Sequence, residues 1–167
     1  MDYKRIAIIG ISASGKSTAS RILASKTRLP LFHMDQLFWR ESGEDVPEEE
    51  YLEKHAVLTA YEEWIIEGYV DEKMSERLKR ADLVLYLDYS RWRCSIQLMR
   101  RWLTRPQARR FELVPEALEK FSARFLWRVF SRGERPRIEK AIQDAHPIVM
   151  HRFSTPGEFK KFLLEKF

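Results

Sequence analysis

Residues 10 to 18 have the types and spacing that could bind and activate a phosphate. They read Gly10-Ile11-Ser12-Ala13-Ser14-Gly15-Lys16-Ser17-Thr18, which fits the pattern Gly-x-x-x-x-Gly-Lys-Ser. Gly10 allows a sharp turn, and Gly15 lets backbone N–H groups approach phosphate oxygens without a side chain in the way. Lys16 places a positive charge where the β- and γ-phosphates of ATP would lie, and Ser17 offers a hydroxyl to Mg²⁺. The segment is therefore predicted to be a phosphate-binding loop.

The residues on either side of this loop favour the same interpretation. A short β-branched apolar run, residues 5–9, precedes it, and Ala19, Ile22 and Leu23 follow it at helical spacing. This context predicts strand, loop and helix in succession, with the positive end of the helix facing the phosphates.

The length and composition of the chain limit the possible architectures. With 167 residues and 44% hydrophobic content, it suits one compact domain over 1–167. No apolar run is long enough to cross a membrane or to act as a signal peptide, so we expect a cytoplasmic location and no membrane partner. Cys94 is the only cysteine, which excludes an intramolecular disulfide, and we expect it to be a buried small residue.

Positive charge is concentrated in one region. Residues 91–137 hold 13 Lys and Arg against 4 Asp and Glu, a balance of +9, although the whole chain has a net charge of +5. Such a segment is expected to bind a polyanion, either a nucleotide or a nucleic acid.

Apolar runs separated by helical patterns predict a parallel sheet covered on both faces. Strands are expected at 5–9, 31–34, 64–66, 83–87 and 147–151. Helices are expected directly after the loop, around Ala19, Ile22 and Leu23, and at about 45–61, 71–80, 90–103 and 116–131, with a last turn or two to about 144 and a final helix from 156. Gly10, Asp35, Glu67 and Asp88 follow strands, and ligands of such sheets bind at the carboxyl ends of strands.

Three residues after the strands are candidates for the acceptor side of the site. Asp35 could hold Mg²⁺ through water or accept a hydrogen bond from an acceptor hydroxyl, and its alternative role is a turn or helix cap. Glu67 could orient a magnesium-bound water. Trp39 could line an acceptor pocket or belong to the core. For Asp88, capping of the next helix is the favoured interpretation.

An arginine-rich loop is predicted at 104–115, after the helix at 90–103. Arg101, Arg105 and Arg109 are best placed to close over the γ-phosphate as catalytic lid residues, because phosphoryl transfer needs alignment and neutralised charge. The region at about 36–61 would then form the acceptor side, and about 100–115 the lid.

Several segments together resemble a known family. They are the loop Gly10 to Ser17, Phe32-His33-Met34-Asp35, Trp64-Ile65-Ile66-Glu67-Gly68-Tyr69, and Leu87-Asp88-Tyr89-Ser90-Arg91-Trp92. This set resembles the DNA topology modulation proteins, small bacterial P-loop proteins similar to adenylate kinase. The resemblance implies a three-layer α/β fold of the nucleoside-monophosphate-kinase type, strand order 2-3-1-4-5 and a closing lid.

The resemblance also implies roles for individual residues. It implies that residues 10–18 bind ATP, that Asp35 and Trp39 lie on the acceptor side, and that the arginines near 100–110 belong to the lid. Adenylate kinase continues its third strand with Asp-Gly-Phe-Pro-Arg, whose arginine grips the acceptor phosphate, whereas Glu67-Gly68-Tyr69-Val70 supplies no arginine. The identity of the acceptor is therefore open.

Two functions are compatible with these observations. The first is an ATP- and Mg²⁺-dependent kinase that transfers the γ-phosphoryl to a small acceptor, which could be a nucleotide. The alternative is a nucleotide-dependent DNA-binding regulator, suggested by the +9 segment and by Arg124, Arg128 and Arg132 at four-residue intervals. The kinase is preferred, because a nucleotide-binding lid explains most of the arginines and no DNA-reading motif is present. The protein could act as a monomer or a homodimer.

Overall fold

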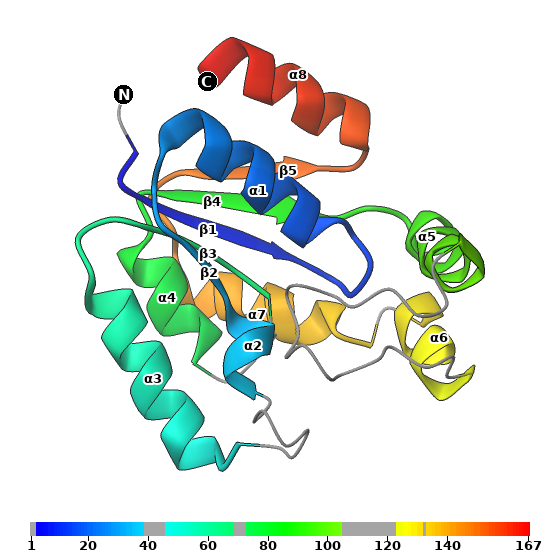
Figure 1. Cartoon of the computed structure of the whole chain (residues 1–167), viewed down its shortest axis with the longest axis horizontal. Helices are drawn as coiled ribbons and strands as arrows, with labels where there is room; N and C mark the ends of the chain where they lie inside the picture. Colours follow the sequence, from blue (N-terminus) through cyan, green and yellow to red (C-terminus); the bar gives the residue numbers. More distant parts are fainter. Residues whose placement is uncertain (1–2, 39–45, 69–72, 105–122, 132) are drawn as a thin grey trace.

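A five-stranded, all-parallel sheet forms the centre of the fold (Figure 1). The computed structural model describes residues 3–38, 46–68, 73–104, 123–131 and 133–167. The strands are β1 (Arg5–Gly10), β2 (Leu31–His33), β3 (Trp64–Glu67), β4 (Leu83–Leu87) and β5 (Met150–Phe153). Their spatial order is β2-β3-β1-β4-β5. The predicted parallel sheet and the order 2-3-1-4-5 are confirmed.

Helices cover both faces of this sheet. In Figure 1, α1 and α8 lie on one face, α3, α4 and α7 lie on the other, and α5 and α6 stand near the carboxyl ends of the strands. The helices of the described residues are α1 (Lys16–Thr27), α2 (Met34–Phe38), α3 (Glu48–Ala60), α4 (Met74–Arg80), α5 (Arg91–Thr104), α6 (Ala123–Phe130), α7 (Arg135–Ala145) and α8 (Pro156–Lys166). None of them is long and apolar enough to span a bilayer.

The central strands are almost entirely apolar, with Arg5 at the start of β1 and Glu67 at the end of β3 as exceptions, because neither face of the sheet meets water. Every residue of β3 and β4 is buried, as is β1 from Ile6 onward. Burying one such Val, Leu or Ile side chain contributes roughly 1.5–3 kcal/mol. Continuous burial explains why these strands show no alternation of polar and apolar residues.

The last strand and the helix before it differ from the prediction. The strand expected at 147–151 is β5 at Met150–Phe153, which pairs with β4 from Val84, and Ile148 is 92% exposed. The expected last turn or two is the complete helix α7, which has Pro136 in its first turn. Proline is tolerated there because the first N–H groups of a helix have no intrahelical acceptor. Register with β4, rather than local apolarity, sets the start of β5.

The sequence of α5 predicts a helical stripe of apolar residues, Trp92, Ile96, Met99 and Leu103, but this stripe is not the buried face of the helix. Trp92, Ile96, Met99 and Leu103 are 61%, 54%, 45% and 78% exposed. The buried residues of this helix are Cys94, Ser95, Leu98 and Trp102. The expectation that Cys94 is buried is therefore confirmed.

Candidate active site

The phosphate loop joins β1 to α1 as predicted. Gly10 ends β1 with φ +154°, and a Cβ built on it would lie 2.7 Å from the carbonyl oxygen of Leu87. Only glycine fits there, because β4 passes so close. The Ser14 N–H donates to the carbonyl of Ile11 at 3.1 Å, and Ala13 has a φ of +61°, so the loop curls tightly before α1 begins.

All the predicted ATP-binding residues lie in this one loop and the first turn of α1. They are Gly10, Ser12, Ala13, Ser14, Gly15, Lys16, Ser17 and Thr18. The Lys16 ammonium donates to the carbonyls of Gly10 at 2.9 Å and Ile11 at 3.1 Å. Both partners are neutral, so these contacts do not cancel the positive charge of Lys16.

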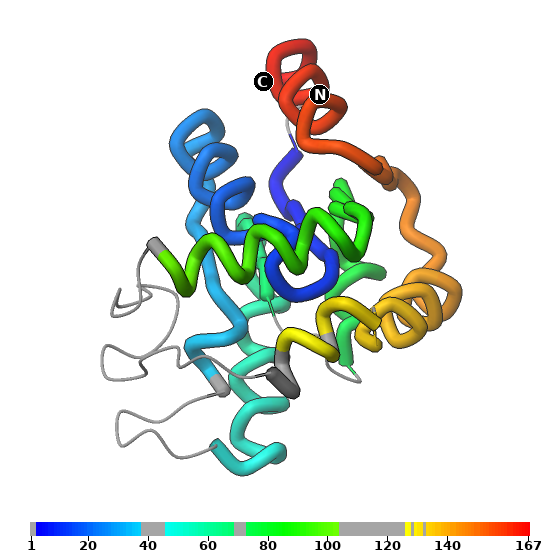
Figure 2. Tube along the Cα trace, turned by 90° about the vertical axis from the view of Figure 1, so that its right-hand side faces the viewer, coloured from blue at the N-terminus to red at the C-terminus, as the bar shows by residue number. Residues whose placement is uncertain are grey.

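A carboxylate from the other end of the chain contacts the same loop. Glu134, the N-cap residue of α7, accepts hydrogen bonds from the backbone N–H of Ser12 at 2.6 Å and from its hydroxyl at 2.7 Å. The views agree that the start of α7 lies beside the loop (Figures 1 and 2). Sequence reasoning missed Glu134, because nothing near it in the chain marks it as a loop contact.

The acceptor-side candidates Asp35 and Glu67 come together at the ends of β2 and β3. His33 and Glu67 are register partners in these strands, and the imidazole Nδ1 is in hydrogen-bond contact with Glu67 Oε1. Gly68, with φ +103°, follows Glu67, and a Cβ built on it would lie 3.3 Å from Asp35 Oδ1. Asp35 therefore packs against Gly68, the residue that follows Glu67 in the chain. His33 is a further site residue that the sequence reasoning left out.

The surroundings of the buried Glu67 carboxylate favour its ionised form. Its side chain is fully buried, and burial alone would raise its pKa. The hydrogen bond from His33 and the positive charge of Lys16 outweigh burial and hold the pKa of Glu67 below its usual range, and the Ser17 hydroxyl adds to this lowering. Glu67 is thus electrostatically coupled to the phosphate loop on the neighbouring strand.

The residues around Ser17 fit a magnesium ion. Glu67 Oε2 is buried and has no hydrogen-bond partner among the described residues, which leaves an anionic oxygen for a cation or its water. Mg²⁺ usually takes only one or two protein oxygens and fills its shell with water and phosphate oxygens. The described residues contain no group of three or more His, Cys, Asp or Glu that could enclose a metal.

Asp88, directly after β4, takes part in an ion-pair network, and its capping of the next helix stays a prediction. Its Oδ2 lies 3.1 Å from an Arg135 nitrogen and 3.2 Å from Arg152 Nε. The hydroxyl of Ser90 accepts a hydrogen bond from the Arg93 N–H at the start of α5. The network fixes the start of α7, with Arg135, against the ends of β4 and β5.

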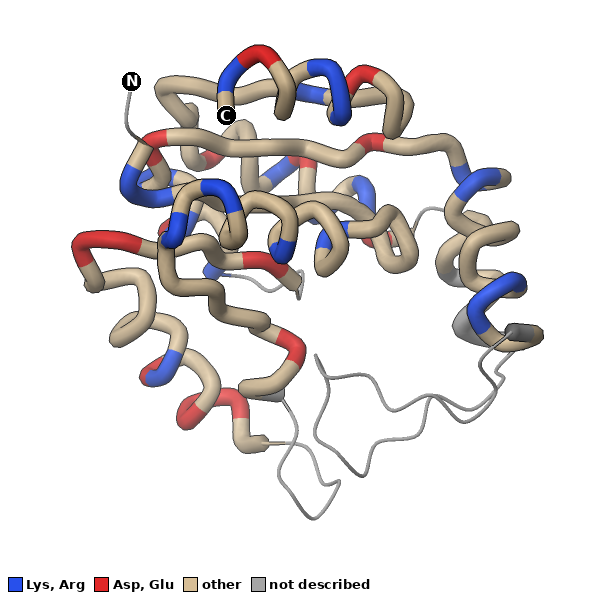
Figure 3. Tube along the Cα trace, turned by 45° about the horizontal axis from the view of Figure 1, so that its top comes forward, with Lys and Arg blue, Asp and Glu red and all other residues tan. Residues whose placement is uncertain are grey.

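Helix α5 lines the other side of the loop. The amide of Gln97 lies 3.8 Å from a Cβ position built on Gly15. Gln97 also lines a cavity of about 440 Å³ with Arg93, Ile96 and Arg100. Arg101 follows on the same helix and is half-buried. Figure 3 shows the basic residues of α5, in contrast with the acidic start of α3.

Three predicted site residues lie outside the described residues. They are Trp39 on the acceptor side and Arg105 and Arg109 in the lid. Most of the predicted lid loop, 105–115, is outside them as well. So are Asp45, the first residue of the helix predicted at 45–61, and residues 116–122 of the helix predicted at 116–131.

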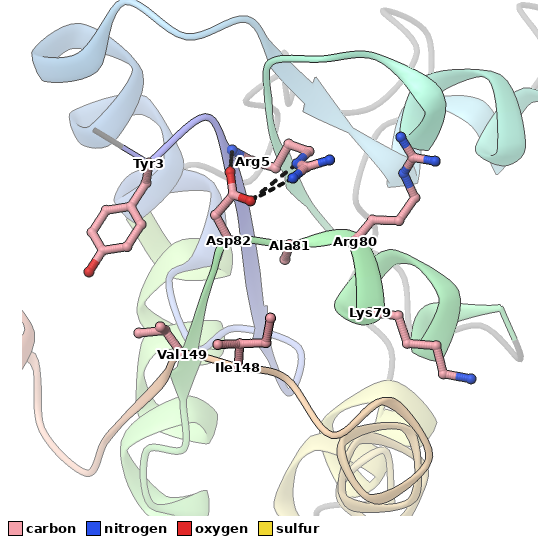
Figure 4. Close-up of a pocket in the computed structure, with 8 residues that line it drawn as sticks. All are labelled: Tyr3, Arg5, Lys79, Arg80, Ala81, Asp82, Ile148 and Val149. Atoms are coloured by element: carbon pink, nitrogen blue, oxygen red, sulfur yellow. Dashed lines mark hydrogen bonds and ion pairs between the residues drawn. The ribbon is translucent and has the colours of Figure 1, made fainter. Parts of the chain in front are cut away.

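A second cavity of about 440 Å³ lies at the amino ends of the strands, away from the phosphate loop (Figure 4). Its lining includes the ion pair between Arg5 and Asp82, at 2.7 Å. Asp82 Oδ2 also accepts hydrogen bonds from the backbone N–H groups of Arg5 and Lys4, at 2.9 and 3.1 Å. These contacts tie the start of β1 to the start of β4, which indicates a structural role.

No family model matches the chain, and no curated protein matches its sequence. Solved structures match it over nearly its whole length. A shikimate kinase from Bacteroides thetaiotaomicron is 14% identical, with a TM-score of 0.58, over 98% of this chain and 95% of that one. A deoxyadenosine kinase from M. mycoides with bound dATP is 15% identical, with a TM-score of 0.54, over 97% and 98%. The fold is that of the P-loop kinases.

A third structure agrees with these two. A shikimate kinase from Acinetobacter baumannii in complex with shikimate is 18% identical, with a TM-score of 0.51, over 98% of this chain and 95% of that one. At such identities the likeness establishes the fold. Within the P-loop kinase fold, the function of this chain has to be argued from its own residues.

Proposed function

We propose that this protein is a phosphotransferase that moves the γ-phosphoryl group of ATP to a hydroxyl of a small molecule. The observation that carries the proposal is the placement of Glu67 within the electrostatic reach of Lys16 and Ser17, with Asp35 packed against Gly68, the residue that follows Glu67. A cationic loop for the donor phosphates and an acidic group for the acceptor stand on adjacent strands, β1 and β3. This arrangement supplies the alignment and charge that phosphoryl transfer needs.

The donor side is assigned to the loop. Lys16 would leave the carbonyls of Gly10 and Ile11 to meet the β- and γ-phosphates, and backbone N–H groups of the loop would donate to the same oxygens. Arg101, Arg105 and Arg109 are proposed to neutralise the charge that spreads over the transferred group. Mg²⁺, held by Ser17 and through water by Glu67 or Asp35, would bridge the phosphates and withdraw charge from them.

The acceptor side favours a hydroxyl over a phosphate. An acceptor phosphate would bring further negative charge beside the carboxylates of Glu67 and Asp35, which is unfavourable at short range. A hydroxyl can instead donate a hydrogen bond to a carboxylate. Shikimate and deoxyadenosine, the compounds for which the neighbouring kinases are named, both carry alcohol hydroxyls.

The DNA-binding alternative has less support. The fold neighbours are kinases. The DNA alternative depends on Arg124, Arg128 and Arg132, and the structure does not describe the side chains of these residues. Adenylate-kinase-like use of a nucleoside monophosphate is the closest competing acceptor class, so the test includes it.

The test is a phosphoryl-transfer assay with radiolabelled Mg-ATP against nucleosides, sugars and other polyols, and nucleoside monophosphates. We expect transfer to at least one hydroxyl compound that is not a phosphate. Asp35→Asn should lower kcat/KM for that acceptor by about 100-fold or more and leave the Kd of ATP within about twofold. Lys16→Met should weaken ATP binding and abolish transfer.

Thermal unfolding provides the control for these variants. Lys16→Met loses the hydrogen bonds to two loop carbonyls, so its Tm without ligand should be slightly lower than that of the wild type, and its Tm should not rise when Mg-ATP is added. Transfer only to monophosphates would contradict the hydroxyl acceptor. No stabilisation by any nucleoside triphosphate would contradict the phosphotransferase as a whole.

A further inference from the structure

The contact between Glu134 and Ser12 is the unusual feature of the phosphate loop. Both oxygens of one carboxylate are bonded to the backbone N–H and the hydroxyl of a single loop residue. The residues are 122 positions apart in sequence, so only the tertiary fold brings them together. A carboxylate of the chain itself thus lies on the surface that is expected to bind the phosphates of the substrate.

A carboxylate and a phosphate offer these donors the same chemistry. Each presents anionic oxygens, and hydrogen bonds to an ionised acceptor are about twice as strong as neutral ones. Glu134 does not pair with the ammonium of Lys16, whose Nζ is bonded to the carbonyls of Gly10 and Ile11. Glu134 therefore competes with a phosphate for the Ser12 donors, and the Lys16 charge stays available to attract that phosphate.

We propose that Glu134 is an internal competitor of the donor nucleotide, which occupies Ser12 in the empty site and is displaced by the terminal phosphate. This inference rests on the proposed function, because it assumes that the loop binds a polyphosphate. Only molecules with Glu134 displaced would bind, so the apparent Kd would equal the intrinsic Kd divided by the fraction of such molecules. Glu134 would then determine the affinity for triphosphates and reduce the occupancy of the site at low ATP concentration.

Displacement of Glu134 does not require α7 to leave the sheet. The next residue, Arg135, is paired with Asp88 at 3.1 Å and with Glu139 at 3.4 Å. Arg152 also pairs with Asp88 and Glu139. These contacts hold the first turn of α7 while the Glu134 side chain changes its rotamer, so the switch is confined to one side chain and Ser12.

The experiment compares polyphosphate binding by the wild type and three variants. Calorimetry would give the Kd of inorganic tripolyphosphate and of ATP without Mg²⁺. Glu134→Gln removes the charge but keeps the shape, and should bind both about tenfold more tightly. Glu134→Asp keeps the charge but is one methylene shorter, and should shift the Kd in the same direction by less. Asp144→Asn makes the same charge change at an exposed position of α7, and its Kd should stay within about twofold of the wild type.

Hydrogen exchange of the Ser12 amide provides a second, ligand-free readout. It should be faster in Glu134→Gln than in the wild type, because the carboxylate protects that N–H. Equal exchange rates in the two proteins, or binding by Glu134→Gln that is no tighter than wild-type binding, would overturn the proposal that Glu134 competes with the nucleotide. The proposed function would not be affected. If neither protein binds any polyphosphate, the proposed function itself fails, and the competitor fails with it.

Discussion

His33 and Glu67 pair directly across the ends of β2 and β3, with the imidazole Nδ1 in contact with the carboxylate Oε1. Glu67 is fully buried and Nδ1 has an ionised partner, so the imidazole is expected to donate this bond. The pair fixes the Glu67 carboxylate beside the phosphate loop and leaves its other oxygen without a partner among the described residues.

A double-mutant cycle should detect this coupling. Glu67→Gln and His33→Asn should each lower the free energy of unfolding by about 1–3 kcal/mol, because each leaves a buried polar group without its partner. The double variant should lose about 1–2 kcal/mol less than the sum of the two. Urea denaturation of the four proteins measures this difference. Additive losses would show that the two side chains are independent.

Asp82 should make stability depend on pH at the opposite end of the sheet. Burial raises the pKa of Asp82, but the Arg5 guanidinium and the backbone N–H groups of Arg5 and Lys4 outweigh burial and lower it. A lowered folded-state pKa gives stability that is present above the unfolded pKa of about 3.9 and is lost as the pH falls through the folded value.

Asp82→Asn should therefore lower the free energy of unfolding by about 1 kcal/mol at pH 7 and by little at the lowest pH. The value at pH 7 is discounted because the Arg5–Asp82 pair is partly exposed. Urea denaturation from pH 7 down to about pH 3 measures the change. The matched control is Asp144→Asn, which should show wild-type pH dependence because Asp144 is exposed. A constant difference between Asp82→Asn and the wild type at all pH values would exclude this linkage.

Gly68→Ala should separate acceptor binding from nucleotide binding. The new Cβ would lie 3.2 Å from the Asp35 N–H nitrogen and 3.3 Å from its Oδ1, and φ is +103°. We expect a loss of about 1–3 kcal/mol in stability and a raised KM for the acceptor, because Asp35 has to move. The Kd of ATP should stay near the wild-type value. The control is Gly157→Ala on α8, where the new Cβ would lie 3.8 Å from its nearest neighbour, Thr155 Oγ1. An equal loss of stability and an equal rise in KM in this control would contradict the role of the close approach at Gly68.

Cys94 should be inert in the folded protein. Burial raises the pKa of its thiol to about 11, and the side chain is fully buried in the face of α5 that packs on the core. At pH 8 only about one molecule in a thousand would carry the thiolate. A thiol-reactive dye should label the native protein far more slowly than the urea-unfolded one. Fast labelling of the native protein would indicate that α5 opens readily.

The sequence alone determined the parts that depend on local patterns. The spacing of Gly10, Gly15, Lys16 and Ser17 specifies a phosphate loop, because each of these residue types has a direct role in binding phosphate or Mg²⁺ or in turning the backbone. Continuous apolar runs specified the parallel sheet, since both faces of each strand are covered. These patterns also placed Asp35 and Glu67 at strand ends, where the structure brings them together.

Only the tertiary structure decided which distant residues meet. Local apolarity suggested the wrong start for β5 and marked a stripe of α5 that is exposed, because register and packing partners are not encoded within one segment. The contacts of Glu134 with Ser12 and of His33 with Glu67 span 122 and 34 positions of sequence. Side-chain contacts across such separations depend on how the strands and helices pack, so no spacing rule within the chain could have predicted them.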